Sequence, residues 1–473
     1  PKEMLEGFSN KGMITVALLF LVSEGIRQSG TLGQVIKKLL PQGKTTVFKA
    51  QLRILPSVAF ISAFLNNTPV VVIFAPIIKH WAKSVKLPAT KFLIPLSYVT
   101  ILGGICTLIG TSTNLVVHGM ILEAGYEGFT MFELGKVGIF IAIAGIIYLF
   151  IFSKRLLPDA RPDTAVPDEE VEEGEKLHRV EAVLGARFPG INKKLSDFNF
   201  QRHYGAEVKE IKTRNGQRYV DHLEDVVLRE GDTLVVMADD TFIPTWGESS
   251  VFVLLTNGND PDTSGKKKRW LALILLVLMI VGATVGELPA TKEMFPDIKL
   301  DMFFFVCITT IIMAWTNIFP ARKYTKYISW DILITIACAF AISKAMVNSG
   351  VADCVAGFII GLSDDYGPHV LLAILFVITN LFTELITNNA AAALAFPLAL
   401  SISAQLGVSP TPFFVVICMA ASASFSTPIG YQTNLIVQGI GNYKFTDFVR
   451  IGLPLNIITF LISVILIPLI WNF

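Results

Sequence analysis

Two short runs of amide and hydroxyl side chains interrupt the apolar sequence. They are Asn66-Asn67-Thr68-Pro69 and Thr387-Asn388-Asn389-Ala390. Each run lies between apolar stretches that are shorter than the roughly 20 residues a membrane-spanning helix needs. The pattern predicts two re-entrant hairpins with their tips midway through a membrane. Asn and Thr at such a tip can cap the following helix, and they also offer neutral dipoles to a ligand. A capped hairpin that binds nothing is the alternative.

A second pair of polar interruptions is Thr107–Asn114 and Ser424–Asn434. They break two apolar spans, over residues 92–121 and 413–440. Unwound backbone at membrane depth exposes carbonyl oxygens, which together with neutral Asn side chains suit a hard cation such as sodium. A helix N-terminus carries about half a positive charge and suits an anion. The four breaks therefore predict one anion with coupled cations; kinks that serve packing alone are the alternative.

The same segments carry no pattern for covalent or ATP-driven chemistry. No acidic pair lies in the breaks, which disfavours a proton relay of two carboxylates, and no GxxxxGK(S/T) motif occurs. The five cysteines stand singly in apolar runs, so no disulfide framework is expected. A transporter is expected, and not an enzyme.

A few ionisable residues lie within or beside the apolar spans. Glu24 and Arg27 are one helical turn apart and are predicted to pair. Glu384 comes three residues before the second tip, where it either tunes cation affinity or marks a helix end. Lys79, at the end of a hairpin arm, is interpreted as a residue that extends toward the membrane surface.

An internal repeat organises these features. Residues 107–117 align with residues 427–437 at an offset of 320, and at an offset of 321 Asn67 meets Asn388. Transporters are commonly built from two inverted repeats whose broken helices meet at the site. We expect one repeat over about 11–152 and the other over about 331–470.

Two apolar stretches, residues 270–288 and 302–319, precede the second repeat. Nothing before residue 11 corresponds to them. A further pair of helices is therefore expected to precede residue 1 in the natural protein.

The composition predicts an all-α polytopic membrane protein with one soluble insert. Of the 473 residues 52% are hydrophobic and 16% charged, against about 25% charged in soluble proteins. Residues 154–269 hold 40 of the 77 Asp, Glu, Lys and Arg side chains. The expected domains are a membrane part over 1–153, the insert over 154–269, and a membrane part over 270–473 that contains two scaffold helices and the second repeat.

Charge also predicts the orientation and excludes one class of partner. Basic runs at Lys154-Arg155 and Lys266–Arg269 flank the insert, which places it in the cytoplasm and the protein in the plasma or inner membrane. A net charge of +1 gives no reason to expect nucleic acid as a partner. Membrane lipid is the expected surrounding.

The insert reads as a small α+β module. An acidic linker over 165–177 comes first, followed by a helical stretch over 193–203. Strands are predicted over 206–212 and 232–237, with Asn215-Gly216 as a hairpin turn.

At the tips and breaks the sequence resembles the divalent anion–sodium symporter family of the ion transporter superfamily. That family carries Ser-Asn-Thr at both tips, where this chain has Asn66-Asn67-Thr68 and Thr387-Asn388-Asn389. Gly110–Asn114 and Thr427–Asn434 are similar to its unwound helices. The resemblance implies a homodimer that moves its substrate-bearing helices as an elevator against a fixed scaffold.

The resemblance also implies which residues bind. The expected sodium ligands are Asn67, Gly110, Thr111 and Asn114 in one site, and Asn388, Thr427, Gly430 and Asn434 in the other. The expected substrate contacts are Asn67, Thr68, Thr113, Asn388, Asn389 and Thr433. Because Asn389 stands where the family has the closing Thr, sulfate or another small oxyanion is slightly favoured over di- and tricarboxylates.

The insert resembles the small C-terminal ligand-binding module of potassium-conductance regulators (RCK-C). The similar residues are 195–208 and 228–236. The resemblance implies dimerisation and a small regulatory ligand such as a cyclic dinucleotide; a purely structural insert is the alternative.

The expected function is sodium-driven symport of a small divalent anion, sulfate or a dicarboxylate. A proton- or arsenite-type antiporter of the same superfamily is one alternative. A potassium transport subunit is another, suggested by the insert alone.

Overall fold

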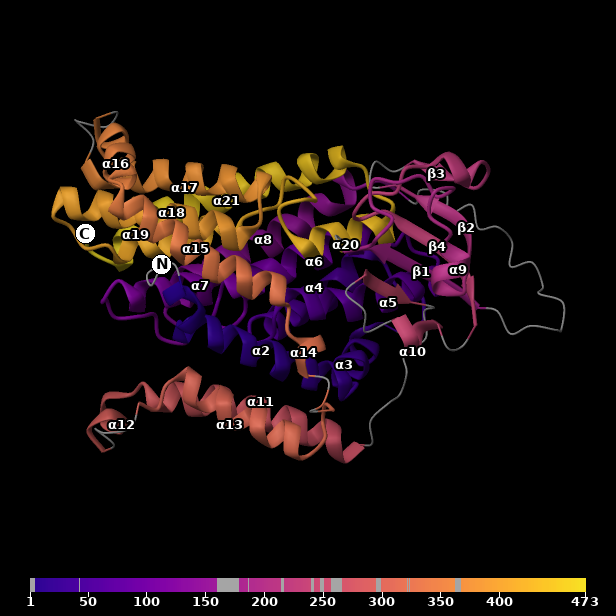
Figure 1. Cartoon of the computed structure of the whole chain (residues 1–473), viewed down its shortest axis with the longest axis horizontal. Coiled ribbons are helices and arrows are strands. Elements are labelled where there is room, and N and C mark those ends of the chain that lie inside the picture. Colours follow the sequence, from indigo (N-terminus) through magenta and orange to yellow (C-terminus); the bar gives the residue numbers. More distant parts are fainter. Residues whose placement is uncertain are drawn as a thin grey trace.

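The chain forms a bundle of helices with a small sheet packed against one end (Figure 1). The computed structural model describes residues 5–41, 43–159, 178–185, 187–213, 217–239, 242–246, 251–256, 266–294, 299–320, 322, 324–361 and 367–473.

The helices before the insert follow the predicted apolar runs and end at the predicted breaks. They are α2 (Lys11–Gln28), α3 (Thr31–Leu39), α4 (Val47–Ser62), α5 (Asn67–Ser84), α6 (Thr90–Gly104), α7 (Ser112–Glu123) and α8 (Gly135–Leu156), preceded by the short 3-10 turn η1 (Gly7–Ser9). The side chain of Asn10 caps α2 by accepting the N–H of Gly12 at 2.7 Å.

After the insert a connecting group of helices leads to the second repeat. The connecting helices are α11 (Lys266–Gly286), α12 (Pro289–Met294), α13 (Met302–Trp315) and α14 (Tyr324–Tyr327). The second repeat comprises α15 (Trp330–Asn348), α16 (Val351–Gly361), α17 (Gly367–Leu385), α18 (Asn388–Leu406), α19 (Thr411–Ser422), α20 (Gln432–Gly441) and α21 (Phe445–Ile470).

The two repeats match element by element, from α2 with α15 to α8 with α21. Even the turns between the first two helices agree. Gly30 and Gly350 both adopt left-handed backbone, with φ of 71° and 74°, a conformation that costs glycine little.

The two hairpins enter the bundle from opposite ends. The α4–α5 hairpin starts where α8 finishes, because Gln51 Nε2 on α4 donates to Ser153 Oγ at 2.9 Å. The α17–α18 hairpin starts at the other end, where His369 contacts the ring of Phe473 with centroids 5.0 Å apart. In Figure 1 the first hairpin lies toward the sheet and the second toward the C-terminus. This is the arrangement of inverted repeats.

The helices can be sorted into two groups by their position in the two repeats. In the first, α4 packs on α6, α6 on α8, α8 on α21, and α17 on α19. In the second, α13 packs on both α2 and α11. The groups meet chiefly where α15 and α16 lie against α18, and where α2 lies against α7. We call them the hairpin group (α4–α8 and α17–α21) and the outer group (α2, α3, α11, α13, α15 and α16).

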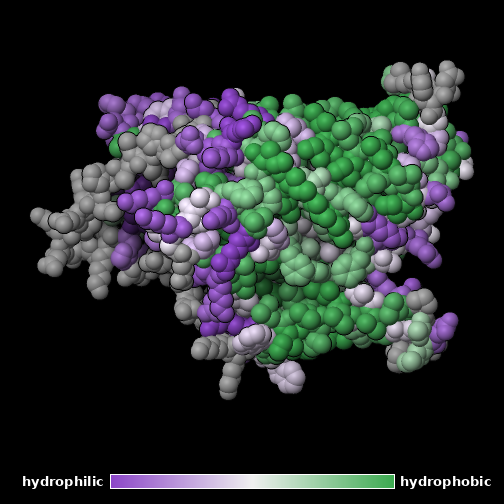
Figure 2. All heavy atoms as spheres, turned by 180° about the vertical axis from the view of Figure 1, so that it is seen from behind, coloured by the Kyte–Doolittle hydropathy of each residue, from purple (hydrophilic) through white to green (hydrophobic). Residues whose placement is uncertain are grey.

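The helical part has the surface of a membrane protein. Among the described residues, five helices are long and apolar enough to cross a bilayer, or six if α15 and α16, bent by 71°, form one broken span. Exposed apolar side chains recur every fourth residue on α21, namely Leu453, Ile457, Leu461 and Ile465. Figure 2 shows the apolar surface over the helices and the hydrophilic surface concentrated at the insert end.

The insert is a five-stranded sheet with two short helices. Its elements are β1 (His178–Leu184), α9 (Phe200–Tyr204), β2 (Glu207–Lys212), β3 (Arg218–Tyr219), the 3-10 turn η2 (Leu223–Asp225), β4 (Thr233–Ala238), α10 (Phe242–Trp246) and β5 (Phe252–Thr256). The strand order is β3-β2-β4-β1-β5, and each neighbouring pair of these strands is antiparallel. Phe188, Phe198, Tyr204 and Phe252 lie in an apolar core of its own.

The insert confirms two predicted elements and corrects others. The strands predicted over 206–212 and 232–237 are β2 and β4, and they pair directly, with Ile211 opposite Leu234. The helix predicted over 193–203 is wrong in length, because Lys194 forms a bridge with Val227 and the helical turn begins only after Asn199. Asn215-Gly216 and the acidic linker over 165–177 lie outside the described residues.

Candidate substrate and cation site

Both polar tips begin a helix, as the sequence predicts. Helix α5 starts at Asn67 after Asn66, and α18 starts at Asn388 after Thr387. The Thr387 hydroxyl caps α18 by accepting the N–H of Ala390 at 3.4 Å. Both tips are therefore helix N-termini; Asn67 at the first tip is buried, whereas Thr387 at the second tip is exposed.

Both breaks are unwound and also lead into helix N-termini. Helix α6 ends at Gly104 and α7 begins at Ser112, while α19 ends at Ser422 and α20 begins at Gln432. The predicted interruptions over 107–114 and 424–434 therefore contain the non-helical backbone and the first turn of the following helix.

The two unwound segments are held by the same hydrogen bonds. Asn114 Nδ2 donates to the Thr107 carbonyl at 2.9 Å, and Asn434 Nδ2 donates to the Thr427 carbonyl at 3.2 Å. The hydroxyls of Thr107 and Thr427 in turn donate to the carbonyls of Ala63 and Glu384 near the two tips. Thr107, Asn114, Thr427 and Asn434 thus fasten each break to the hairpin of its own repeat.

A tyrosine hydroxyl joins the first tip to both breaks. Asn67 Nδ2 donates to Tyr431 Oη at 2.6 Å, and Tyr431 Oη lies 2.9 Å from Thr111 Oγ1. The Asn388 side chain lies near the same tyrosine hydroxyl. Asn67 and Asn388, which are 321 positions apart, therefore reach one common point.

Each tip also contacts the break of the opposite repeat. Asn388 Nδ2 donates to Thr113 Oγ1 at 2.7 Å, and Asn389 Oδ1 accepts from Thr113 Oγ1 at 3.3 Å. On the other side Thr68 Oγ1 donates to Gln432 Oε1 at 3.2 Å. Four helix N-termini, those of α5, α7, α18 and α20, thus converge.

Gly104 allows the close approach of the first tip. A β-carbon at this position would lie 2.6 Å from Asn67 Oδ1 and 3.1 Å from the Gly110 carbonyl oxygen. Asn67 Oδ1 also accepts from Ser62 Oγ at 2.8 Å, and Asn67 is 1% exposed. The amide is therefore fixed in orientation.

One predicted cation ligand has an oxygen free to bind. Asn114 is fully buried, and its Oδ1 has no hydrogen-bond partner. A buried carbonyl oxygen without a donor is costly, and a cation would satisfy it. The equivalent Asn434 differs, since its Oδ1 accepts from Ser97 Oγ at 2.7 Å. The first predicted sodium site therefore fits a cation more directly than the second.

Thr433 was also predicted to contact the substrate, but its hydroxyl is not bonded to the residues at the two tips. Its Oγ1 accepts from Ser97 Oγ on α6 at 2.9 Å, and it is fully buried. The other predicted contacts, Asn67, Thr68, Thr113, Asn388 and Asn389, are brought together by the bonds described above.

Sequence reasoning missed several polar residues of this region. Tyr431 and Ser97 have no motif of their own, although Tyr431 stands opposite Thr111 in the repeat alignment. Glu384 is part of a network: its Oε1 accepts from Asn456 Nδ2 at 2.7 Å and from the Ser426 N–H at 2.9 Å. The carboxylate therefore lies against the second break, and the predicted pairing of Glu24 with Arg27 is confirmed at 2.6 Å.

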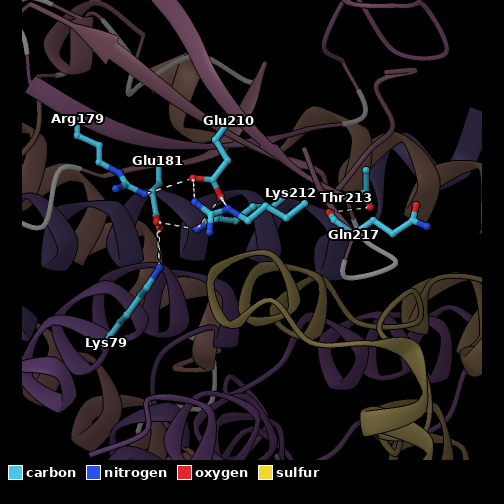
Figure 3. A network of polar contacts seen from close by, with 8 residues as sticks. Lys79, Arg179, Glu181, Glu210, Lys212, Thr213 and Gln217 are labelled. Atoms are coloured by element: carbon cyan, nitrogen blue, oxygen red, sulfur yellow. Dashed lines mark hydrogen bonds and ion pairs between the residues drawn. The ribbon is translucent and has the colours of Figure 1, made fainter. Parts of the chain in front are cut away.

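The insert docks on the hairpin group by a buried ion pair. Figure 3 shows Lys79 rising from α5 to Glu181 on β1, with Lys212 beside it. Lys79 Nζ lies 3.0 Å from both carboxylate oxygens of Glu181, and Lys212 Nζ lies 3.3 Å from one of them. Lys79 therefore has a carboxylate partner in the insert, which the sequence did not predict.

Charge sets the ionisation of this contact. Burial alone would raise the pKa of Glu181, yet the ammonium groups of Lys79 and Lys212 lower that pKa to about 2. The carboxylate is ionised at any physiological pH.

The insert also packs closely on the half-helix α20. A β-carbon at Gly439 would lie 2.6 Å from Thr233 Oγ1 and 3.6 Å from Val183 Cγ2. Val183 is fully buried and lies in the apolar cluster of the membrane helices, unlike the rest of the insert core. The insert therefore touches α5 and α20, both of which begin at the site.

Comparisons with known proteins agree with this architecture. A family model described as citrate transporter matches residues 1–407 and 294–473. An uncharacterised transporter of Synechocystis is 29% identical over the whole of this chain and 91% of its own length. Sodium/sulfate cotransporter 2 of Chlamydomonas reinhardtii is 30% identical over 59% of this chain and 31% of its own length.

A more distant relative is named for a different substrate. The sodium-dependent dicarboxylate transporter of Staphylococcus saprophyticus is 25% identical over 31% of this chain and 28% of its own length. The resemblance to divalent anion–sodium symporters of the ion transporter superfamily is thereby confirmed. With matches that span the entire sequence, the chain belongs to the citrate transporter family of membrane transporters.

Proposed function

We propose that the protein is a sodium-coupled symporter of a small divalent anion, with sulfate preferred to dicarboxylates. The observation that carries the proposal is the convergence of four helix N-termini on neutral amide and hydroxyl groups of Asn67, Thr111, Asn388 and Tyr431. The positive ends of the helix dipoles stabilise an anion there.

Neutral ligands explain why cations accompany the anion. No Lys or Arg is recorded in hydrogen bonds with the two tips among the described residues. A dianion would therefore retain most of its charge at membrane depth, which is unfavourable unless cations bind beside it. The free Asn114 Oδ1 and the carbonyls of the unwound segments are suited to sodium.

The preference for sulfate has two supports. A sodium/sulfate cotransporter is among the relatives. Asn389 also replaces the threonine of the family signature at the second tip, and its Oδ1 is occupied by Ser112 and Thr113 hydroxyls at 3.1 and 3.3 Å. Fewer hydroxyl donors then remain for an extended dicarboxylate.

The proposed movement is an elevator in which the hairpin group slides against the outer group. Both tips and both breaks belong to the hairpin group, so the site would move as one unit. We further propose that the protein works as a homodimer in the plasma or inner membrane, with the insert in the cytoplasm.

The insert is proposed to be an RCK-C-like regulatory module. A surface cavity of about 370 Å³, lined among others by Tyr219, His222 and Arg229, is of the size of small-molecule pockets. Titration of the full-length protein with cyclic di-AMP tests this role: heat of binding is expected, and its absence would favour a structural insert.

Uptake into proteoliposomes tests the proposed function. Radiolabelled sulfate and succinate are supplied with an inward sodium gradient, with an equal potassium gradient, or with a proton gradient alone. Sulfate accumulation that requires sodium is expected. Sulfate uptake indifferent to sodium would reject the coupling, and uptake driven by protons alone would favour the antiporter alternative.

A further inference from the structure

Tyr431 and Thr111 are equivalent residues of the two repeats, and they touch each other. They are 320 positions apart, each directly precedes the helix that follows its break, and their hydroxyls lie 2.9 Å apart. A contact between equivalent positions places both on the pseudo-symmetry axis of the site.

The two positions differ in size and not in polar chemistry. Both side chains carry a hydroxyl, but Tyr431 adds a six-carbon ring, which is 6% exposed. The neighbouring pair repeats the difference: Gln432 reaches Thr68 across the site at 3.2 Å, whereas its counterpart Ser112 is short and bonds Asn389 at 3.1 Å. The second repeat therefore places larger side chains at these two positions than the first repeat does.

The hydrogen bonds of Tyr431 fix where its proton points. Asn67 Nδ2 donates to Tyr431 Oη at 2.6 Å, so the phenol proton is directed to the remaining partners. Thr111 Oγ1, at 2.9 Å, is a hydroxyl that can accept this proton, and an anion between the tips would offer a stronger, charged acceptor.

We propose that Tyr431 determines substrate specificity: its ring shortens the space between the two tips, and its hydroxyl donates to a compact tetrahedral oxyanion such as sulfate. The proposal rests on the proposed anion site and names its substrate class. A four-carbon dicarboxylate needs room for two separated carboxylates, and the ring occupies that room.

Two substitutions separate the ring from the hydroxyl. Tyr431→Thr copies the residue of the first repeat, which removes the ring and keeps a hydroxyl. Tyr431→Phe keeps the ring and removes the donor. Tyr324→Thr, at a half-exposed position in α14, is the matched control.

Binding of sulfate and of succinate to the purified full-length protein in sodium chloride is measured by isothermal titration, alongside uptake by proteoliposomes. Tyr431→Thr is expected to lower the preference for sulfate over succinate at least tenfold, mainly by improving succinate. Tyr431→Phe is expected to weaken sulfate about tenfold while succinate stays excluded. Tyr324→Thr is expected to match the unmodified protein.

A preference that is unchanged in Tyr431→Thr, in a variant whose thermal unfolding matches that of Tyr431→Phe, would overturn the inference. So would an unmodified protein that binds succinate as tightly as sulfate. Sulfate binding without sodium-driven uptake would instead refute the proposed function, and the preference ratio would still be measurable from binding.

Discussion

The polar residues at the site are neutral, which avoids the cost of burying an unpaired charge inside a membrane. A buried charged side chain without a partner is costly, whereas amides and hydroxyls that bond one another are satisfied when no ligand is present. Asn67 and Thr111 do this through the hydroxyl of Tyr431, and Asn388 does it through the hydroxyl of Thr113. Substrate and cations can then bring opposite charges that neutralise each other.

Removing a tip amide is expected to weaken sodium binding. Asn67→Ala and Asn388→Ala each delete an amide at the common point, so the sodium concentration for half-maximal sulfate uptake should rise about tenfold, as for the loss of one good ligand. Ser57→Ala, at an exposed position of α4, is the control. An unaltered sodium curve in both variants would reject the site assignment.

Close packing at the second break predicts a sharp effect of one methyl group. A β-carbon at Gly430 would lie well inside contact distance of the Thr383 carbonyl oxygen and of Ser424 Oγ, so the segment must shift. Gly430→Ala is expected to destabilise the protein by about 1–3 kcal/mol and to abolish most uptake. Thermal unfolding in detergent measures the first and proteoliposomes the second.

Gly357→Ala is the matched control, because a β-carbon at Gly357 would lie 3.8 Å from Gln405 Oε1, an ordinary contact. Equal behaviour of the two alanine variants would contradict the packing of the second break.

The sequence located the tips and the breaks, because neutral polar residues in an apolar run are visible without coordinates. It placed Tyr431 in the second break but did not name it as a site residue, and it did not locate Ser97. Their partners Asn67 and Asn434 lie 364 and 337 positions away, so the contacts cannot be read from local patterns. The Glu384–Asn456 bond was hidden for the same reason.

At the scale of elements, the ion pair of Glu181 fastens the insert to α5. Glu181→Gln leaves the ammonium of Lys212, which is 3% exposed, without its nearer carboxylate. Loss of one partner of a buried pair is expected to weaken docking by about 3 kcal/mol. Hydrogen exchange in β1 and α20 should therefore rise.

The matched control is Glu207→Gln, since Glu207 and its partner Lys209 are 55% and 52% exposed. An exposed pair contributes less than about 1 kcal/mol, so exchange there should stay nearly unchanged. Equal exchange in the two variants would show that the Lys79–Glu181 contact does not hold the insert.

The same pair predicts a pH dependence. Because the pKa of Glu181 is lowered from 4.5 to about 2, the docked insert binds this proton more weakly than the undocked one. The stabilisation is complete above about pH 4.5 and is lost as the pH falls toward 2. The difference in Tm between the unmodified protein and Glu181→Gln should be constant from pH 8 to 5 and disappear toward pH 2; a loss between pH 8 and 6 would contradict the assignment.

Elements of the membrane part were more predictable than those of the insert. The apolar spans over 92–121 and 413–440 and their polar breaks correctly indicated the pairs α6 and α7, and α19 and α20. In the insert, β1 and β5 were not predicted. Their pairing partners are distant in sequence, as Leu234 and Leu255 are from Ala182. Short strands of this kind depend on the sheet around them and carry a weak local signal.

At the scale of the whole molecule, a cross-link between the two helix groups is expected to affect transport. Asp353 on α16 bonds Ser401 on α18, across the boundary between the groups. A cross-link between Asp353→Cys and Ser401→Cys is expected to stop uptake, and a reductant should restore it, if the groups slide.

The matched control is a cross-link between Thr233→Cys and Gly439→Cys, which joins the insert to α20 within the hairpin group. Uptake should continue with this second bond formed. Continued uptake with the Asp353–Ser401 pair linked would refute the elevator movement.

Inverted repeats also bear on the direction of transport. Two identical repeats would make the states open to either side of the membrane equal in free energy, so cargo would leave as readily one way as the other. The two repeats differ at corresponding positions near the site: Tyr431 corresponds to Thr111, and Glu384 corresponds to Ala63. The states open to the two sides of the membrane are therefore expected to differ in free energy, and so are their affinities for the substrate.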